Sequence, residues 1–187
     1  MVAPGASVGS GSDPATRPEH PSPARLAGLP PENFAGELAT FLRDRTDHLV
    51  SEAKASLRQA QLEHYEKDGL DAMERRLAAL LEVTVACLDA GDAGPIVDHT
   101  TRIARKRFAA GYDLLEVQTS INVIEEVLWS RILTSLPPEH QAHALGLVSG
   151  LLGLGKDALA RTYVALAREP AGAVDTSGGG VLDPSVA

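Results

Sequence analysis

Residues 103–136 read IARKRFAAGYDLLEVQTSINVIEEVLWSRILTSL, and this stretch decides the fold. It predicts the end of one helix, a corner at Gly111 and a long amphipathic helix after the corner. Apolar residues recur in the second helix at intervals of three or four, which is typical of a helix with one continuous apolar stripe. The stripe consists of Leu114, Val117, Ile121, Ile124, Leu128 and Ile132.

Three local signals predict the corner independently. Glycine readily takes the left-handed conformation that commonly ends a helix, which suits Gly111. Asp113 and Glu116 have the spacing of a capping box, and Tyr112 and Val117 stand at the two positions of a hydrophobic staple. The second helix is therefore expected to begin directly after Asp113.

The chain outside this stretch shows starting signals for further helices. The tetrapeptide Leu-Pro-Pro-Glu occurs at 29–32 and again at 136–139, and each copy is expected to open a helix because proline fits a first turn. Asp71 and Glu74 have capping-box spacing and predict a helix that begins directly after Asp71. Pro95 predicts the first turn of the helix that leads to the corner.

Helical spacing also predicts which faces are buried. The apolar pattern of the first helix continues to Leu49 and weakens after Ser51, where either an exposed continuation of the same helix or a second helix at an angle to it is expected. In the helix before the corner, the expected inward residues are Ile96, Thr100, Ile103 and Phe108. The other face is expected to be an exposed basic side, formed by Arg102, Arg105, Lys106 and Arg107.

The last helix contains an uncharged run at 144–155, which predicts burial on several sides. Gly146, Gly150 and Gly153 lie on one face of it and are expected to let a neighbouring backbone approach closely. No segment alternates polar and apolar residues in the manner of a strand. The expected fold class is all-α, a bundle of about five main helices with the last two at its centre.

Composition bounds the classes of function. Residues 1–31 and 169–187 are poor in large apolar side chains, so both are expected to be disordered tails around one folded unit at 32–168. The formal net charge of −8 disfavours nucleic-acid binding, which depends on phosphate neutralisation. No secretory signal and no apolar run of membrane-spanning length is found. A cytoplasmic protein that does not contact membranes is expected.

No motif for catalysis or for metal binding is found. His140 and His143 are three residues apart, but no third ligand is near in sequence, so exposed first-turn histidines are expected. Cys87 stands on an apolar helix and is expected to be a buried structural thiol. No serine has a nucleophile context, and the glycines of the last helix lack the features of a phosphate-binding loop. The expectation is a protein without catalytic residues, metal or cofactor.

His99 leaves an alternative function open. Histidine phosphotransfer modules present an exposed helical histidine followed three positions later by a basic residue, and Arg102 stands at that position. Ile103 stands where those modules need a small residue, so its bulk would obstruct a docking receiver domain. The main interpretation of His99 is a partly exposed polar residue, and a phosphoacceptor is the alternative. A bundle that binds haem or another small molecule is a further alternative.

Charges on both sides of the corner indicate an interaction site. The basic side before the corner suits an anion or an acidic partner, although cations near a helix C-terminus are favoured by the helix dipole in any case. Glu116, Glu125 and Glu126 are candidate ion-pair partners across the corner. The specific hypothesis is that Arg107 pairs with Glu116 and fixes the angle between the two helices. The apolar surplus on the last two helices predicts self-association as a homodimer.

The corner resembles the N-terminal helical domain of RsbR-type co-antagonists, stressosome-associated regulators of the RsbT kinase, and best of all the RsbRD subgroup. The shared pattern is a helix that ends Arg-x-x-x-Gly-aromatic, followed by a polar cap and Leu-x-Glu-hydrophobic at the start of a long helix. It consists here of Arg107, Gly111, Tyr112, Asp113, Leu114, Glu116 and Val117.

The resemblance spans about residues 35–168. It implies a helical signal-input domain that can be dimeric, is related in some members to globins without haem, and passes a conformational change to an output domain. Only a short segment follows Arg168. The chain is therefore expected to act in trans, by docking on a separate output protein or a kinase or STAS-type regulator, or to sense and signal alone as a homodimer.

Overall fold

The structure is a computed structural model that describes residues 31–59 and 69–168. This part of the chain contains six helices and no strand, so the all-α prediction is confirmed. In chain order the helices are α2 (Pro31–Arg43), α3 (Thr46–Gln59), α5 (Leu70–Ala90), α6 (Gly94–Ala109), α7 (Leu114–Ser135) and α8 (Pro138–Arg168). Apart from Pro31, the predicted tails lie outside the described residues.

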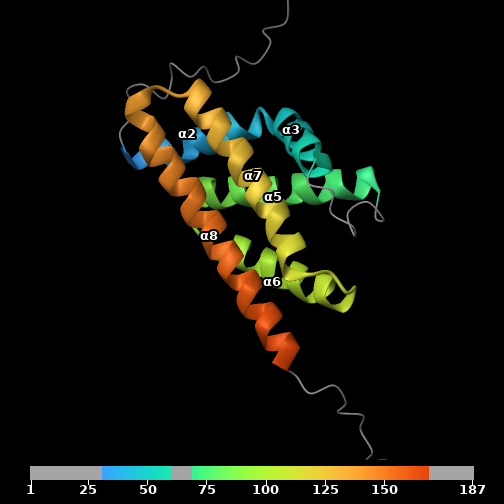
Figure 1. The fold of residues 1–187 in the computed structure, drawn as a ribbon. Helices are drawn as coiled ribbons and strands as arrows, with labels where there is room; N and C mark the ends of the chain where they lie inside the picture. Colours follow the sequence, from blue (N-terminus) through green and yellow to red (C-terminus); the bar gives the residue numbers. More distant parts are fainter. Residues whose placement is uncertain (1–30, 60–68, 169–187) are drawn as a thin grey trace, which may run out of the picture.

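Helix α5 occupies the centre of the bundle. It crosses the middle of the molecule, with α2 and α3 toward one end, α6 toward the other, and α7 and α8 across the front (Figure 1). It packs against all the other described helices, whereas the most extensive single contact joins α6 and α8. The prediction that the last two helices are central is therefore incomplete, because α5 buries apolar residues on more than one side. Its buried residues include Met73, Leu77, Leu80, Leu81, Val85, Cys87 and Leu88.

The first predicted helix is in fact two helices, and the break lies after Arg43 rather than after Ser51, where a second helix was one of the two alternatives. The chain turns after Arg43, whose carbonyl oxygen accepts a hydrogen bond of 2.9 Å from the Thr46 hydroxyl. The Arg45 guanidinium donates to the Phe41 carbonyl at 2.9 Å and lies 4.0 Å from the centroid of the Phe41 ring. The apolar spacing continues through this turn because both pieces pack on α5.

The proline signals are confirmed at the starts of three helices. Each Leu-Pro-Pro-Glu tetrapeptide opens a helix, and the helix begins at the second proline in both copies, Pro31 and Pro138. Helix α6 begins at Gly94 with Pro95 in its first turn. Proline suits these positions because the first amides of a helix have no partner within it.

The capping box predicted at the start of α5 is wrong. The helix begins at Leu70, so Asp71 lies inside its first turn. Gly69, with φ 82°, occupies the cap position, and among the described residues no side chain caps the helix. Glu74 forms an ion pair with Lys54 of α3. The carboxylate therefore joins two helices, a contact between distant residues that the local spacing could not reveal.

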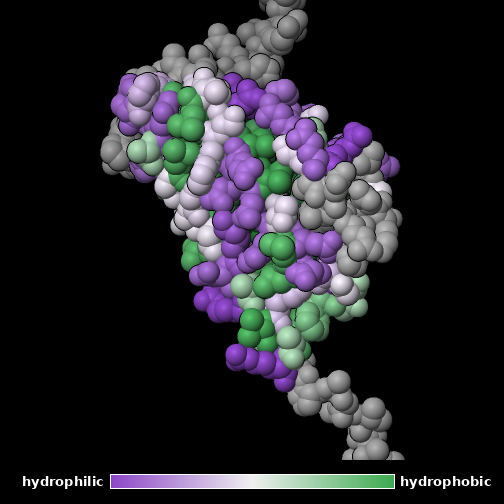
Figure 2. Space-filling view, viewed as in Figure 1, coloured by the Kyte–Doolittle hydropathy of each residue, from purple (hydrophilic) through white to green (hydrophobic). Residues whose placement is uncertain are grey.

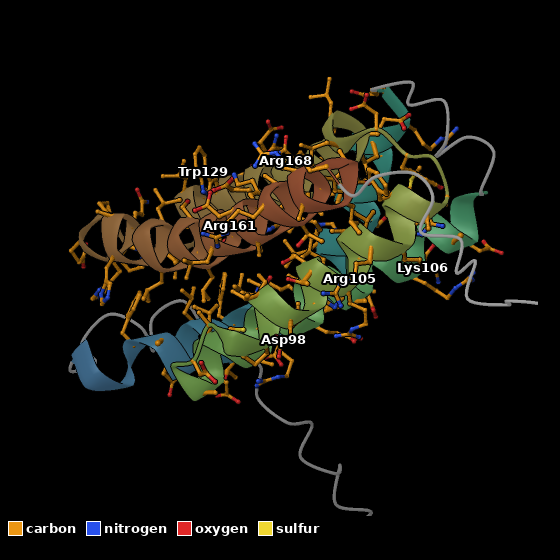
Figure 3. All side chains as sticks on the ribbon, turned by 90° about the horizontal axis from the view of Figure 1, so that it is seen from below. Asp98, Arg105, Lys106, Trp129, Arg161 and Arg168 are labelled. Carbon is orange, nitrogen blue, oxygen red and sulfur yellow. The ribbon has the colours of Figure 1, made fainter. Side chains whose placement is uncertain are left out.

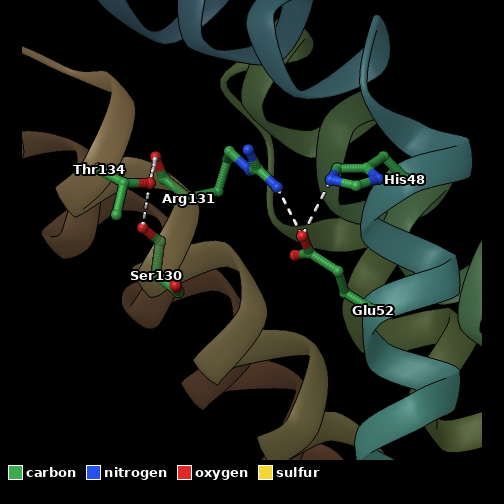
Figure 4. Close-up of polar contacts among 5 residues, drawn as sticks. All are labelled: His48, Glu52, Ser130, Arg131 and Thr134. Carbon is green, nitrogen blue, oxygen red and sulfur yellow. Dashed lines mark hydrogen bonds and ion pairs between the residues drawn. The ribbon is translucent and has the colours of Figure 1, made fainter.

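A polar bridge joins α3 to α7. Arg131 of α7 donates to the carboxylate of Glu52 on α3 at 2.6 Å, and His48 lies 3.0 Å from the same oxygen (Figure 4). One turn along α7, the Thr134 hydroxyl donates to the Ser130 carbonyl at 2.7 Å. Glu52 thus joins two helices that are far apart in sequence.

The glycine-rich part of α8 is covered on one side only. Its buried residues are Ala144, Val148, Leu152 and Gly155. A Cβ atom added to Gly146, Gly150 or Gly153 would meet no atom of the described chain within 4 Å, so the expected close approach at these glycines is wrong within one chain. Gly155 has that role, because a Cβ there would lie 3.2 Å from Cγ2 of Thr100 on α6.

Candidate regulatory site at the corner between α6 and α7

Helix α6 ends in a hydrogen-bonded turn of the Schellman type. Gly111 has φ 79°, and its N–H donates to the Phe108 carbonyl at 3.0 Å. The N–H of Tyr112 donates to the Arg107 carbonyl, also at 3.0 Å. These two bonds satisfy carbonyl groups that the helix leaves without partners. The left-handed corner predicted from the glycine is confirmed.

Helix α7 begins where the capping signal predicts. The Asp113 carboxylate accepts a hydrogen bond of 2.7 Å from the Leu115 N–H and so caps the helix. Tyr112 and Val117, the two predicted staple residues, are both buried. The N-cap is confirmed, whereas the reciprocal contact of Glu116 stays a prediction.

Arg107 is buried, which corrects its predicted place on the exposed basic side. Only 8% of its surface is exposed, and its guanidinium carbon lies 4.7 Å from the centroid of the Tyr112 ring. The buried face of α6 consists of Ile96, Thr100, Ala104 and Arg107, which are regularly spaced along the helix. Phe108 was expected inward and is instead 37% exposed. The prediction that Arg107 is exposed failed because arginine is seldom buried without compensation.

Tyr163 of α8 connects the corner to the last helix, and the sequence analysis missed it. Its hydroxyl donates to the Tyr112 carbonyl at 3.3 Å. Its ring meets the Phe108 ring edge-on, with 5.6 Å between centroids. One side chain therefore contacts residues on both sides of Gly111. A tyrosine on the apolar stripe of a helix was the available signal, since a buried tyrosine usually finds a hydrogen-bond partner.

A cavity lies beside the corner, between α5, α6, α7 and α8. It measures about 30 Å³, and its polar lining residues are Arg76, Thr100, Arg107 and Ser120. This volume suits roughly two water molecules. Pockets for small molecules usually measure about 300–1,000 Å³. The cavity is thus too small for haem or a metabolite, so the small-molecule alternative gains no support from it.

The other charged candidates fall into two groups that do not meet. The exposed cations of α6 are Arg102, Arg105 and Lys106, and none forms an ion pair with another described residue. Figure 3 shows Arg105 and Lys106 on the outer side of α6. Glu125 is buried and pairs with Lys156 of α8 at 2.6 Å, so its predicted role across the corner is wrong. Glu125 faces α8, whereas Glu126 is exposed.

Phosphotransfer needs an accessible ring nitrogen, and the Nε2 nitrogen of His99 is not accessible. The side chain is half-buried, and its Nε2 is buried without a hydrogen bond to any described residue. Burial, and next the neighbouring Arg102, lower the pKa of His99 below its ordinary value. The geometry therefore does not support the phosphoacceptor alternative.

His140, His143 and Cys87 have packing roles. The rings of His140 and His143 stack with the Phe34 ring, at centroid distances of 5.3 and 4.8 Å. His143 is exposed and His140 is half-buried. Within residues 31–59 and 69–168, no group of three or more His, Cys, Asp or Glu residues could hold a metal ion. Cys87 is buried, as predicted, and burial raises the pKa of its thiol.

Comparison with known proteins identifies one family. The family model described as RsbT co-antagonist protein rsbRD N-terminal domain matches residues 46–177, which include α3 to α8 and the corner. No curated protein and no solved structure matches the chain. In the part of the chain that the structure describes, no helix has the length and apolarity needed to cross a membrane.

Proposed function

The chain belongs to the family of RsbRD N-terminal domains of RsbT co-antagonists, and from this premise we propose that it is a non-enzymatic sensory module that acts through protein–protein contacts. Domains of this family are RsbR-type regulatory modules of stress and sigma-factor signalling and are generally non-catalytic. The module acts in the cytoplasm, where it meets a kinase or another regulator of the same pathway.

The connection between the corner and α8 supports this proposal most directly. A change in the angle at Gly111 displaces the Tyr112 carbonyl and the Phe108 ring, and Tyr163 contacts both groups. Helix α8 extends past the other helices at its C-terminal end (Figure 1). Tyr163 lies five residues before Arg168, the last residue of α8, or about 8 Å along the helix axis, so a displacement of Tyr163 is passed directly to this end of the helix.

The exposed cations of α6 are the proposed docking surface for the partner. Arg102, Arg105 and Lys106 precede the corner directly, and none is neutralised by a described residue of the chain. A partner with an acidic surface would meet them without competition from an internal carboxylate. The family name points to RsbT- or stressosome-related partners, so a kinase or a STAS-type regulator acting in trans fits this surface.

Self-association as a homodimer is part of the proposal. Large apolar side chains stand exposed on α7 and α8: Trp129 at 41%, Leu133 at 50% and Leu154 at 45%. Hydrophobic groups lie among hydrophilic ones on the face that carries these helices (Figure 2). A second copy of the chain would remove this apolar surface from water.

Titration calorimetry with a purified RsbT-type kinase, and in parallel with a STAS-type regulator, tests the proposal. The double variant Arg105→Glu, Lys106→Glu should weaken binding at least tenfold, about 1.4 kcal/mol. Arg75→Glu is the matched control, because Arg75 is an exposed cation on α5 without an ion pair among the described residues. Equal affinities for the double variant and the control would place the docking surface elsewhere. No binding to either class of protein would overturn the proposed function.

A further inference from the structure

One side of α8 carries an exposed stripe of residues. The charged residues at one end of this stripe are opposite in sign to those at the corresponding positions of the other end. The stripe consists of Glu139, His143, Gly146, Gly150, Leu154, Asp157 and Arg161, all of which are exposed. The intervals between successive members form the same series in both directions, with Gly150 in the middle. An acidic residue and a histidine stand at one end, and a basic residue and an aspartate stand at the other.

We propose that two copies of this chain associate through this stripe, with their α8 helices antiparallel and with Gly150 at the two-fold axis. In that register Glu139 lies opposite the partner's Arg161, and His143 lies opposite the partner's Asp157. Gly146 lies opposite the partner's Leu154. Each pair occurs twice, once on either side of the axis, as a two-fold symmetric interface requires. The inference rests on the homodimer in the proposed function and names its interface.

The charged residues of the stripe favour a second copy of the chain as the partner. Neither Glu139 nor Asp157 nor Arg161 forms an ion pair with a described residue of its own chain, so all three are available to a second copy. A parallel arrangement of the two helices would place like charges beside each other at both ends. The antiparallel arrangement places opposite charges together, which suppresses the wrong register and orientation.

The centre of the stripe fits a closely approaching helix. A Cβ atom added to Gly146 or Gly150 would meet no atom of the described chain within 4 Å, so the space above both residues is open. The exposed side chain of Leu154 would fill the gap over the partner's Gly146. Trp129 of α7 borders the stripe, since its indole N–H donates to the Ser149 hydroxyl at 2.9 Å. Figure 3 shows Trp129 and Arg161 on the α7 and α8 side of the molecule.

Helix geometry restricts the crossing angle. Glu139 and Arg161 lie roughly 16 Å from the axis at a rise of about 1.5 Å per residue. At a crossing angle of about 20° the helices diverge there by about 6 Å, which the long side chains of glutamate and arginine span. At about 50° the divergence exceeds about 13 Å and the ion pairs are lost. The pairing therefore belongs to the shallow-angle class of helix packing.

A cysteine at the proposed axis tests the register. Two Gly150→Cys chains would bring their new thiols together, with Cα atoms about 4–6 Å apart, within the range of a disulfide. The native Cys87 is buried and does not compete. Mild oxidation should convert Gly150→Cys to a covalent dimer within minutes, whereas Arg75→Cys, an exposed control on α5, should remain uncrosslinked. Equal crosslinking of the two variants would overturn the register.

Charge exchange tests the end contacts by analytical ultracentrifugation. Glu139→Arg and Arg161→Glu should each weaken the dimer tenfold or more, because each change creates two like-charge contacts. The double variant should regain most of the affinity. Circular dichroism checks that these exposed substitutions leave the helical fold unchanged. Equal dimer affinities for both single variants, the double variant and the natural chain would overturn the proposed pairing.

The dimer interface and the proposed function can be overturned independently of each other. A natural chain that stays monomeric at high concentration and still binds the kinase overturns the interface and the homodimer, and leaves the sensory module standing. A chain that crosslinks through Gly150→Cys but binds no kinase or STAS-type regulator supports the interface and removes the proposed function.

Discussion

Replacing Gly111 with alanine should destabilise the fold by about 1–2 kcal/mol, and backbone strain alone should account for the loss. Gly111 has φ 79°, a conformation in which the Cβ of any other L-residue crowds the following carbonyl group. A Cβ atom at this position would meet no atom of the described residues within 4 Å, so no clash with neighbouring described elements adds to the effect. The substitution therefore isolates the conformational requirement of the corner.

The same substitution at Gly153 is the matched control and should have the opposite sign. Gly153 lies inside α8, and a Cβ there would also meet none of the atoms that the structure describes within 4 Å. Alanine has a higher helix propensity than glycine by about 1 kcal/mol, so Gly153→Ala should stabilise the protein. Gly111→Asn should cost less than Gly111→Ala, because asparagine tolerates the left-handed region better than other residues do.

Thermal unfolding followed by far-ultraviolet circular dichroism measures both effects at one protein concentration. For a folded unit of roughly 130 residues, 1 kcal/mol corresponds to about 4 °C in the melting temperature. Gly111→Ala should lower the midpoint by about 4–8 °C, and Gly153→Ala should raise it by about 4 °C. Shifts of equal size in the same direction would refute the argument from backbone conformation.

Three further predictions concern charged and titratable side chains. If Arg107 pairs with Glu116, the charge-reversal variants Arg107→Glu and Glu116→Arg should each lower the free energy of unfolding by about 1–3 kcal/mol. The double variant should recover part of this loss. Unchanged stability in all three variants would contradict the pairing. Lys156→Met leaves the buried Glu125 carboxylate without its cation and should lower the free energy of unfolding, measured by urea denaturation, by about 2–3 kcal/mol. This is less than the ~3–5 kcal/mol of fully buried pairs because the Lys156 side chain is 28% exposed. No loss of stability would mean that the pair does not stabilise the fold. Burial lowers the pKa of His99 below its ordinary value of 6.5, so the unfolded chain binds the proton first and stability is lost as the pH falls through that value. Urea denaturation at about pH 7.5 and about pH 5.5 should show a smaller pH dependence for His99→Gln than for the natural chain, and identical profiles would contradict the assignment.

Local signals predicted the corner and several helix starts correctly. Gly111, Asp113 and the second proline of each Leu-Pro-Pro-Glu tetrapeptide act within one helical turn, since each satisfies or restricts backbone groups only a few residues away. The same type of signal failed at Asp71, because the spacing of a capping box does not show whether the helix begins one residue earlier.

The candidate site was predicted less completely than the corner. Arg107, Tyr112 and Asp113 meet around Gly111 as the family pattern implies, but the burial of Arg107 contradicts the polarity of the residue. Tyr163 was not recognised as part of the site because it is far from the corner in sequence. Residue type alone did not show which side chain of α8 would reach the corner.

The sequence by itself determined the all-α class, most helix starts, the left-handed corner and the family, because these depend on hydrogen bonds and backbone angles within short segments. Only the tertiary structure decided that α5 is central, that Glu125 pairs with Lys156, and that one side of α8 remains uncovered. The physical reason is that burial and ion pairing depend on which helix covers which face. That choice reflects the packing of all the helices together, and no single segment carries it.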